Sequence, residues 1–190
     1  MLSPAVMKIQ AFTHLLAEYT SEYKLIEYMP KKYISLKRLK ELFGITIEDI
    51  LNFCCEVKVY TLGNYFTVKS LHKSGFASKL DELGFDDYFY MSILAEDHED
   101  FSCKRIGRNK IFQTKCNGSF AVSDFIETLI YQEKRLSVDI HELIDLLWDQ
   151  YAICLDKYKI TSDILAGTSM YYNEVTERVY ADYEIYFDEM

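Results

Sequence analysis

Lysine and arginine side chains that can contact phosphate groups gather in two stretches of the sequence. The first begins at residues 31–40 and continues through single lysines to residue 73, and the second covers residues 104–110. Asn52 lies within the first stretch, and its amide can pair with the edge of an adenine. The candidate DNA-contacting residues are Lys31, Lys32, Lys37, Arg38, Lys40, Asn52, Lys58, Lys69, Lys73, Lys104, Arg105, Arg108 and Lys110. Because cations hold DNA through its phosphates, these stretches predict a DNA-contacting surface, and the alternatives are a solvated basic helix face and an exposed hairpin edge.

The second candidate surface is the tyrosine-rich, acidic end of the sequence. Residues 174–189 carry six Asp and Glu against one Arg. The candidate protein-interface residues are Tyr171, Tyr172, Tyr180, Tyr183 and Tyr186. Tyrosine combines apolar area with a hydroxyl group and is favoured at interfaces, so this segment predicts a protein-binding surface. The alternative is an amphipathic terminal helix that closes the core.

The histidines give little indication of catalysis. The string His141-Glu142-Leu143-Ile144-Asp145 is similar to the zinc-binding H-E-x-x-H motif, but an aspartate replaces the second imidazole and Leu143 belongs to an apolar stripe. The sequence holds no phosphate-binding glycine motif and no G-x-S-x-G. We therefore predict a non-catalytic protein without metal or cofactor, and an enzyme is the least favoured alternative.

The net charge of −9 is unevenly distributed along the chain. Residues 1–80 carry 11 Lys and Arg and 7 Asp and Glu, a net charge of +4, whereas residues 81–190 carry 10 and 23, a net charge of −13. Residues 101–123 lie within the acidic half and contain no Asp or Glu. The total charge therefore excludes only a uniformly basic nucleic-acid binder, and it leaves a DNA-binding module possible.

The cysteines and the hydropathy pattern predict a cytoplasmic protein that does not enter a membrane. The five cysteines are an odd number without a C-x-x-C pair, which indicates reduced, mostly buried thiols. No apolar run approaches the 18 or so residues of a membrane-spanning helix. Residues 1–10 lack the charged start and apolar centre of a signal peptide.

Helices and one hairpin are expected to position the first basic stretch. Apolar residues at helical spacing predict a helix over residues 7–28, which Pro30 ends. Ser35 is the expected N-cap of a short helix that Gly44 ends, and Thr46 caps a further helix with Asp49 at the capping-box position. Alternation at residues 57–61 and 65–68 around Gly63-Asn64 then predicts a β-hairpin.

The later part of the chain repeats this order of elements without an exact repeat of residues. We expect helices at residues 78–83 and 86–96, a hairpin of residues 102–106 and 110–114, and a helix over residues 119–132. Ser137 is the expected cap of the next helix, which a short helix capped at residues 161–163 follows. Residues 171–187 are assigned to a helix, with strands as the alternative. The resulting modules are residues 1–76, 77–117 and 118–190.

Residues 33–68 resemble a winged helix-turn-helix. The resemblance depends on the apolar face of the short helix, the turn Phe43-Gly44-Ile45, the helix over residues 46–56 and the hairpin at Gly63-Asn64. It implies that the second helix enters the major groove of DNA and that the hairpin touches the backbone or the minor groove. That helix departs from the pattern, because Glu48, Asp49 and Glu56 would repel phosphates.

The remainder is similar to tandem helix-turn-helix modules at the C-terminal ends of some uncharacterised bacterial proteins. The similar residues are Tyr171-Tyr172-Asn173 and Val179-Tyr180-Ala181-Asp182-Tyr183, and no activity is attached to them. The expected fold is mainly α with short β-hairpins in tandem winged-helix-like modules. The expected function is binding of duplex DNA in transcription or replication, and the alternative is a scaffold that binds a protein or associates with itself.

Overall fold

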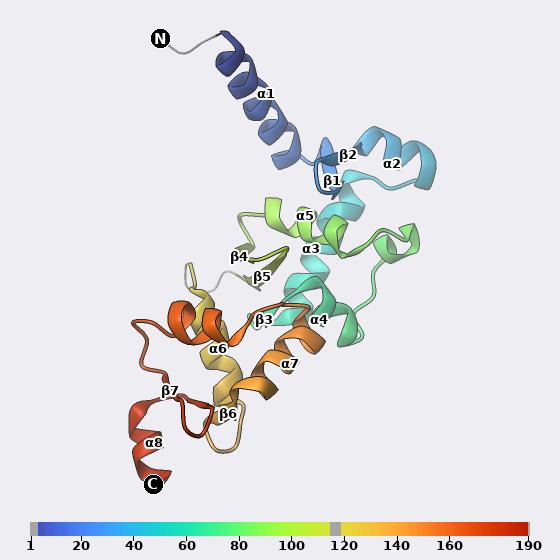
Figure 1. The fold of residues 1–190 in the computed structure, drawn as a ribbon. Helices are drawn as coiled ribbons and strands as arrows, with labels where there is room; N and C mark the ends of the chain where they lie inside the picture. Colours follow the sequence, from blue (N-terminus) through green and yellow to red (C-terminus); the bar gives the residue numbers. More distant parts are fainter. Residues whose placement is uncertain (1–3, 115–118, 190) are drawn as a thin grey trace. The chain divides into compact units, whose positions relative to one another are not determined.

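The computed structural model describes residues 4–114 and 119–189 and divides the chain into two compact units (Figure 1). Unit 1 consists of Met1–Asn64, Ser74–Ser102 and Gln113–Lys115. Unit 2 consists of Tyr65–Lys73, Cys103–Phe112 and Cys116–Met190. Helices predominate and the strands are short and antiparallel, so the predicted mainly α fold with short hairpins is confirmed. Among the described residues, no helix combines the length and the hydropathy needed to cross a membrane.

Unit 1 is built from helices and one two-stranded sheet. Its elements are α1 (Pro4–Ser21), β1 (Leu25–Met29), β2 (Lys32–Ser35), α2 (Leu36–Phe43), α3 (Ile47–Thr61), the 3-10 helix η1 (Lys79–Leu83) and α5 (Asp87–Glu96). The core forms where α2, α3 and α5 bury Leu39, Phe53 and Phe89, each at most 1% exposed. The helices predicted at residues 78–83 and 86–96 are confirmed by η1 and α5.

The helix expected over residues 7–28 is wrong in its last third, because α1 ends at Ser21 and a hairpin follows. Tyr23 has a left-handed backbone (φ 54°), which ends the helical path, and its buried hydroxyl donates to the Ile93 carbonyl at 3.3 Å. β1 then pairs with β2, with Ile26 opposite Ile34. The apolar residues after position 22 therefore lie in a strand, although their spacing also fits a helix.

The predicted turn between α2 and α3 is confirmed. The Ser35 hydroxyl accepts the Arg38 N–H at 3.2 Å at the start of α2. Gly44 ends α2 in the left-handed region (φ 71°), and its N–H donates to the Lys40 carbonyl at 3.0 Å. At the start of α3, the Thr46 N–H and hydroxyl both donate to Asp49 Oδ2, at 2.8 and 2.9 Å.

The hairpin expected around Gly63-Asn64 is wrong, because α3 continues to Thr61. Val57 is fully buried, and it extends the helical stripe of Phe53 and Cys54. The alternation of β-branched residues at 57–61 favours a strand locally, but burial of this stripe overrides that preference. The Thr61 hydroxyl donates to the Val57 carbonyl at 2.9 Å, as expected within a helix.

Unit 2 holds most of the strands. The elements that follow α3 outside unit 1 are β3 (Tyr65–Phe66), α4 (Val68–Lys73), β4 (Phe101–Ile106), β5 (Asn109–Thr114), α6 (Val122–Tyr131), β6 (Ser137–Asp139), α7 (Ile140–Tyr151), the π-helical turn η2 (Lys159–Ile164), β7 (Tyr171–Asn173), β8 (Arg178–Tyr180) and α8 (Tyr183–Glu189). Strands β4 and β5 contribute residues to both units and form the predicted hairpin. The core of unit 2 gathers Phe125, Ile140, Leu147, Ile160 and Val179, each at most 1% exposed.

Two expectations for unit 2 are wrong. The N-cap of α7 is Asp139, whose Oδ1 accepts the N–H groups of His141 and Glu142 at 2.8 and 3.3 Å; Ser137 lies in β6 instead. Residues 171–180 form the hairpin β7–β8, and the helix begins only at Tyr183. Asn173 fixes the turn of this hairpin because its Oδ1 accepts the N–H groups of Val175 and Thr176, both at 2.9 Å.

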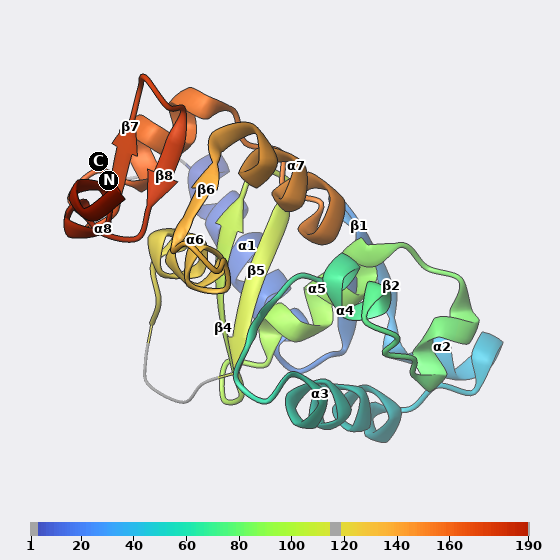
Figure 2. The same cartoon turned by 90° about the horizontal axis from the view of Figure 1, so that it is seen from below.

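Two segments of the chain share one order of elements, except that α5 of the first segment has no counterpart in the second. The segment at residues 47–114 runs α3, β3, α4, η1, α5, β4 and β5, and the segment at residues 122–180 runs α6, β6, α7, η2, β7 and β8. The sheet order is β3-β5-β4 in the first segment and β6-β8-β7 in the second. Figure 2 shows β8 between β6 and β7. In both sheets the single strand thus pairs with the last strand of the hairpin.

A short sequence repeat marks each place where a strand leads into a helix. A buried or half-buried apolar residue is followed by a capping residue, an apolar residue and, three positions later, a buried leucine. The three copies are Ile34-Ser35-Leu36 with Leu39, Phe66-Thr67-Val68 with Leu71, and Val138-Asp139-Ile140 with Leu143. In each copy the cap accepts the backbone N–H of the third residue after it. One local rule therefore starts α2, α4 and α7.

The cysteines are free thiols in the part of the chain that the structure describes, but they are less buried than expected. Cys54 is buried, Cys103 is half-buried, and Cys55 and Cys154 are exposed. Burial raises the pKa of the Cys54 thiol to about 12, so this sulfur stays protonated and unreactive. Cys116 lies outside the described residues.

Candidate nucleic-acid interface

The α2 groove is a cationic hollow of unit 1. It has a volume of about 470 Å³ and lies where α2 and α3 begin. Its lining residues are Lys24, Ser35, Leu36, Lys37, Lys40, Thr46 and Ile47. Three of these are lysines and none carries a carboxylate. A helix start presents backbone N–H groups and the positive end of the helix dipole, so this groove suits an anion.

Two lysines of the α2 groove, Lys24 and Lys37, form exposed ion pairs. Lys24 contacts the carboxylate of Glu22, which raises the pKa of the lysine. Lys37 Nζ lies 3.9 Å from Glu41 Oε1, and the Lys37 side chain is 86% exposed. Exposed pairs of this kind contribute little to stability, so a phosphate can replace the carboxylate at little cost.

Asp49, an acidic residue in the first turn of α3, is paired with a lysine and with the cap of the helix. Lys79 Nζ donates to Asp49 Oδ1 at 2.8 Å, and Thr46 donates to Oδ2. The Lys79 ammonium and then the Thr46 donors lower the pKa of Asp49 to about 2. Its charge therefore serves the cap of α3 and repels an anion in the groove less than a free carboxylate would.

The remaining cations of the first basic stretch divide into exposed and engaged groups. Lys31 and Lys32 are exposed at the turn between β1 and β2, where the Lys31 N–H donates to Glu27 Oε1 at 2.6 Å. Arg38 is exposed on α2. Lys58 lies on α3 and its Nζ is 2.5 Å from Asp100 Oδ1. Lys31, Lys32 and Arg38 are thus exposed and close in sequence to residues that line the groove. Lys58 instead forms an ion pair with Asp100.

Lys69 and Lys73, which the sequence suggested as DNA contacts, bind the end of α7 within unit 2. Lys69 Nζ donates to the Trp148 carbonyl at 2.9 Å and lies 5.5 Å from the centre of the Trp148 ring. Lys73 Nζ donates to the Asp149 carbonyl at 2.7 Å. Both ammonium groups donate to carbonyls of the last helical turn, where they also interact favourably with the negative end of the helix dipole. Their charges therefore stabilise the packing of α4 on α7.

The outer face of α3 is acidic and apolar. Asn52, the candidate adenine contact, is exposed there, but Glu48 and Glu56 are exposed on the same helix. Val59 is 70% exposed, and it lines an apolar groove of about 580 Å³. The other lining residues of this groove are Cys55, Glu56, Tyr60, Gly75, Phe76 and Ala77. This face is poorly suited to phosphates and better suited to a protein.

The β4–β5 hairpin is the second cationic surface. Lys104, Arg105 and Arg108 are exposed, and Lys110 is half-buried. The Arg105 Nε donates to the Gly107 carbonyl at 3.0 Å, which holds the arginine beside the turn. All four cations predicted here thus lie on one hairpin, which no acidic residue interrupts.

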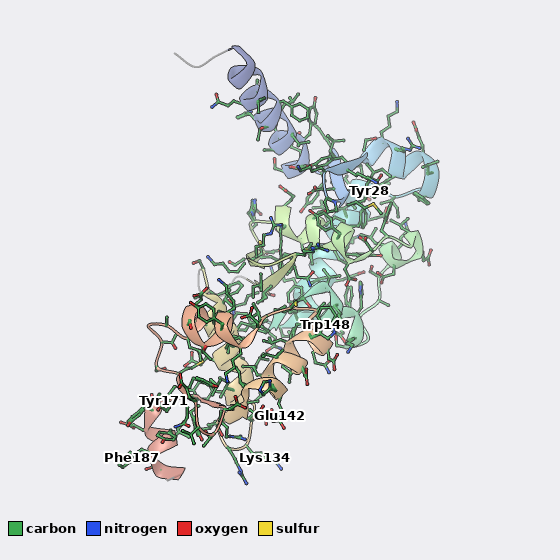
Figure 3. The ribbon with its side chains drawn as sticks, in the orientation of Figure 1. Tyr28, Lys134, Glu142, Trp148, Tyr171 and Phe187 are labelled. Atoms are coloured by element: carbon green, nitrogen blue, oxygen red, sulfur yellow. The ribbon has the colours of Figure 1, made fainter. Side chains whose placement is uncertain are left out.

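Four of the five candidate interface tyrosines pack on one another. The ring centre of Tyr171 is 4.9 Å from the ring centre of Tyr183 and 4.9 Å from that of Tyr186. The ring centres of Tyr180 and Tyr186 are 5.3 Å apart. Figure 3 shows Tyr171 beside α8. Tyr172 instead lies under Lys157 Nζ, 5.4 Å from the ring centre. Most of this tyrosine area therefore holds α8 to the β7–β8 hairpin, although Tyr183 remains 52% exposed.

The histidine string forms no zinc-like cluster in the described residues. His141 Nε2 lies 3.5 Å from Glu177 Oε2, which comes from the turn before β8. Within residues 4–114 and 119–189, no three His, Cys, Asp or Glu side chains come together as a metal site would require.

The chain has no significant match among protein-family models, curated proteins or solved structures.

The chemistry available to the chain therefore follows from its own geometry. Unit 1 offers a lysine-lined groove, and the β4–β5 hairpin offers exposed guanidinium and ammonium groups. Both can donate to phosphate oxygens, and neither holds a nucleophile with an activating base. Sequence inspection found these cations but missed the groove, because the groove depends on Lys24 and on the start of α3 lying beside α2.

Proposed function

We propose that this chain is a non-catalytic DNA-binding protein that holds the phosphate backbone through the α2 groove and the β4–β5 hairpin. The observation that carries the proposal is the α2 groove, where three lysines and the starts of two helices line one hollow without a carboxylate. Phosphates are the anions that such helix starts and lysines commonly bind in protein–DNA complexes.

The shared order of elements supports tandem winged-helix modules as the scaffold. In a winged helix-turn-helix, helices precede a hairpin whose tip can touch DNA, and both segments end in such a hairpin. The sheet orders β3-β5-β4 and β6-β8-β7 match each other strand for strand. In this proposal the β4–β5 hairpin is a wing, and its exposed Lys104 and Arg108 contact the backbone.

The proposed mode of binding is dominated by phosphate contacts. The outer face of α3 carries Glu48 and Glu56, so this helix does not enter a groove of DNA. Lysine and arginine contacts to phosphates carry no sequence information by themselves. We therefore expect weak preference among DNA sequences and an affinity that falls steeply as salt concentration rises.

The test is fluorescence anisotropy with a labelled duplex of mixed sequence, measured at several salt concentrations. Lys37→Glu with Lys40→Glu reverses two charges in the α2 groove and is expected to weaken binding by about 10- to 100-fold at low salt. The control is Lys134→Glu with Arg135→Glu, an equal charge change at exposed positions before β6 (Lys134 is labelled in Figure 3), with less than about a 3-fold effect. Absence of binding by the unaltered chain, or equal losses in both variants, contradicts the proposal.

A protein-binding function has one specific observation in its favour. The outer face of α3 exposes Val59, at 70%, in the lining of the apolar groove of about 580 Å³, and Leu62, just after the helix, is 82% exposed. Isolated apolar residues are ordinary on surfaces, but a grooved apolar face is a feature of protein interfaces. This function predicts a partner whose binding Val59→Glu abolishes and Lys37→Glu leaves unchanged, measured by titration calorimetry.

A further inference from the structure

Strand β7 lies at the outside of its three-stranded sheet and borders a groove (Figure 2). In the described part of the chain, no strand pairs with the side of β7 that faces away from β8. The β7–η2 groove has a volume of about 860 Å³ and is lined both by β7 and by η2 with the residues after it. Its lining includes Thr161, Ser162, Leu165, Met170, Tyr172 and Glu174. This volume is typical of ligand sites.

The hydrogen bonds between β8 and β6 show which way the backbone of β8 points. The Ala181 N–H donates to the Leu136 carbonyl, and the Ile140 N–H donates to the Glu177 carbonyl, both at 2.9 Å. In an antiparallel sheet, the backbone groups of successive residues point alternately to the two sides of a strand. The odd-numbered residues along β8 therefore point toward β6, and the even-numbered residues point toward β7.

The same alternation identifies the free backbone groups of β7. Tyr180 lies opposite Tyr171 and Arg178 lies opposite Asn173, so these two pairs join β8 to β7. Tyr172, between them, directs its N–H and C=O to the open side of the strand, and it also lines the groove. A donor and an acceptor on an edge strand are the groups to which an added strand binds. The backbone of β7 therefore suits an extended peptide better than a compact ligand.

One face of such a peptide would meet the core of unit 2. Tyr172 lies opposite Val179, which is fully buried, so both side chains are on the core face of the sheet. Leu165 and Met170 belong to this core, are 6% and 7% exposed, and line the groove. Because side chains alternate between the two faces of a strand, every second residue of the peptide points toward these apolar groups.

The charge around the groove favours a basic partner. Glu174 is exposed in the lining, and residues 171–189 carry six Asp and Glu against one Arg. Lys157 also lines the groove, but its Nζ donates to Glu177 Oε1 at 2.6 Å, so its charge is already paired. Lysine or arginine at the peptide positions that face solvent is therefore complementary to this part of the chain.

We propose that the β7–η2 groove binds an extended peptide, which pairs with β7 as a fourth strand and alternates apolar residues with basic ones. The three residues of β7 span about 10 Å, and within this strand Tyr172 alone points both backbone groups outward, so few hydrogen bonds form. We therefore expect weak binding, with a Kd of about 10–300 µM. This inference is independent of the proposed DNA binding.

The experiment titrates the full chain into a fluorescein-labelled peptide of eight residues that alternates valine and lysine, and it measures fluorescence anisotropy. Two further peptides carry N-methyl groups on the valine amides or on the lysine amides, so their side chains are the same. An antiparallel strand binds Tyr172 through the valine opposite it, whereas a parallel strand binds through the flanking lysines. One methylated peptide is expected to lose at least about 10-fold in affinity, and the other less than about 3-fold.

A change in the protein tests the place of binding. Ser162→Arg puts a long cationic side chain into the groove at an exposed position and is expected to raise the peptide Kd at least about 10-fold. Val175→Arg makes the same charge change at a position that is 92% exposed and outside the lining, with less than about a 3-fold effect. Because neither position is buried, both variants are expected to keep the Tm within about 2 °C.

Three results would overturn the proposal. The first is no binding of the unmodified peptide at up to about 1 mM protein. The second is an equal loss of affinity from the two methylated peptides, or from the two arginine variants. The third is a dimer of the unaltered chain in sedimentation equilibrium that Ser162→Arg separates, because the groove would then hold a second copy of this chain.

Discussion

Apart from the additional helix α5 in the first, the segments at residues 47–114 and 122–180 share their order of elements, but they carry opposite charge on the hairpins that end them. The β4–β5 hairpin exposes Lys104, Arg105 and Arg108. The turn of the β7–β8 hairpin carries Glu174 and Glu177 instead. Buried residues specify a shared order of elements, whereas hairpin tips in solvent are free to differ. A common scaffold therefore does not imply a common ligand, and a phosphate ligand suits only the first hairpin.

The helices before the two hairpins differ as well. In the first segment α5 buries six of its ten residues, including Phe89 and Ile93, so it is a core helix. In the second segment η2 buries only Ile160, and Tyr158 just before it is 73% exposed. Most side chains of α5 therefore pack in the core. In the proposed DNA binding, the contacts from this part of the first segment come from the hairpin and not from α5.

The largest expected effect comes from the buried leucine of the strand-to-helix repeat. Leu71→Ala and Leu143→Ala each remove a side chain that is at most 2% exposed, and each is expected to cost about 2–4 kcal/mol of unfolding free energy. Urea denaturation measures both. Val175→Ala, at a position 92% exposed, is the control and is expected to change the free energy by less than about 0.5 kcal/mol.

Unequal costs would break the proposed equivalence of the two segments. If one leucine variant loses about 3 kcal/mol and the other less than about 1 kcal/mol, the two strand-to-helix junctions do not play the same part in the core.

The charge difference between the hairpins predicts the next largest effect. If the proposed DNA binding holds, Lys104→Glu with Arg108→Glu weakens duplex binding by about 10-fold and reduces the salt dependence of the binding constant by about two counterions. Glu174→Lys on the other hairpin is expected to change affinity by less than about 3-fold. Anisotropy titrations at several salt concentrations measure both. A similar change from the two hairpins would mean that their charges act only through the total charge of the chain.

Local signals in the sequence predicted much of the fold. The turn at Gly44 and the hairpin at Gly107 depend on residues that are adjacent in sequence, and both are present as expected. The end of α3 and the strands at residues 171–180 were missed because their pattern is ambiguous: valine and tyrosine fit both strands and helices, and tertiary burial decides. The sequence indicated a recurring order of elements, but among modules of residues 1–76, 77–117 and 118–190. The segments at residues 47–114 and 122–180 and their matching sheet order were not predicted, because strand pairing joins residues far apart in sequence.

The candidate site was predictable only as a set of cations. Composition located the basic stretches, but it could not separate Lys37 and Lys40, which line a groove, from Lys69 and Lys73, which bind carbonyls at the end of α7. The two pairs have the same chemistry and similar helical contexts. The structural role of Lys69 and Lys73 depends on the position of α7, which lies more than 60 residues later in the sequence.

The smallest effect concerns the first helices of the two segments, α3 and α6. Each begins with an aspartate that accepts a backbone N–H three residues earlier: Thr46 donates to Asp49 and Ala121 donates to Asp124, both at 2.8 Å. Asp49 also accepts the Thr46 hydroxyl and the Lys79 ammonium, whereas Asp124 accepts the Ser123 hydroxyl at 3.4 Å. We therefore expect Asp49→Ala to cost about 1–2 kcal/mol at neutral pH and Asp124→Ala about 0.5 kcal/mol.

The pH dependence distinguishes these two caps. Folding lowers the pKa of Asp49 from near 3.8 to about 2, so its contribution to stability is complete above pH 4 and is lost as the pH falls toward 2. The difference in unfolding free energy between the unaltered chain and Asp49→Ala should therefore shrink between pH 5 and pH 3 in urea titrations. If the difference stays constant over this range, the Lys79 ion pair does not form in solution, and the two caps are equivalent despite the extra partners of Asp49.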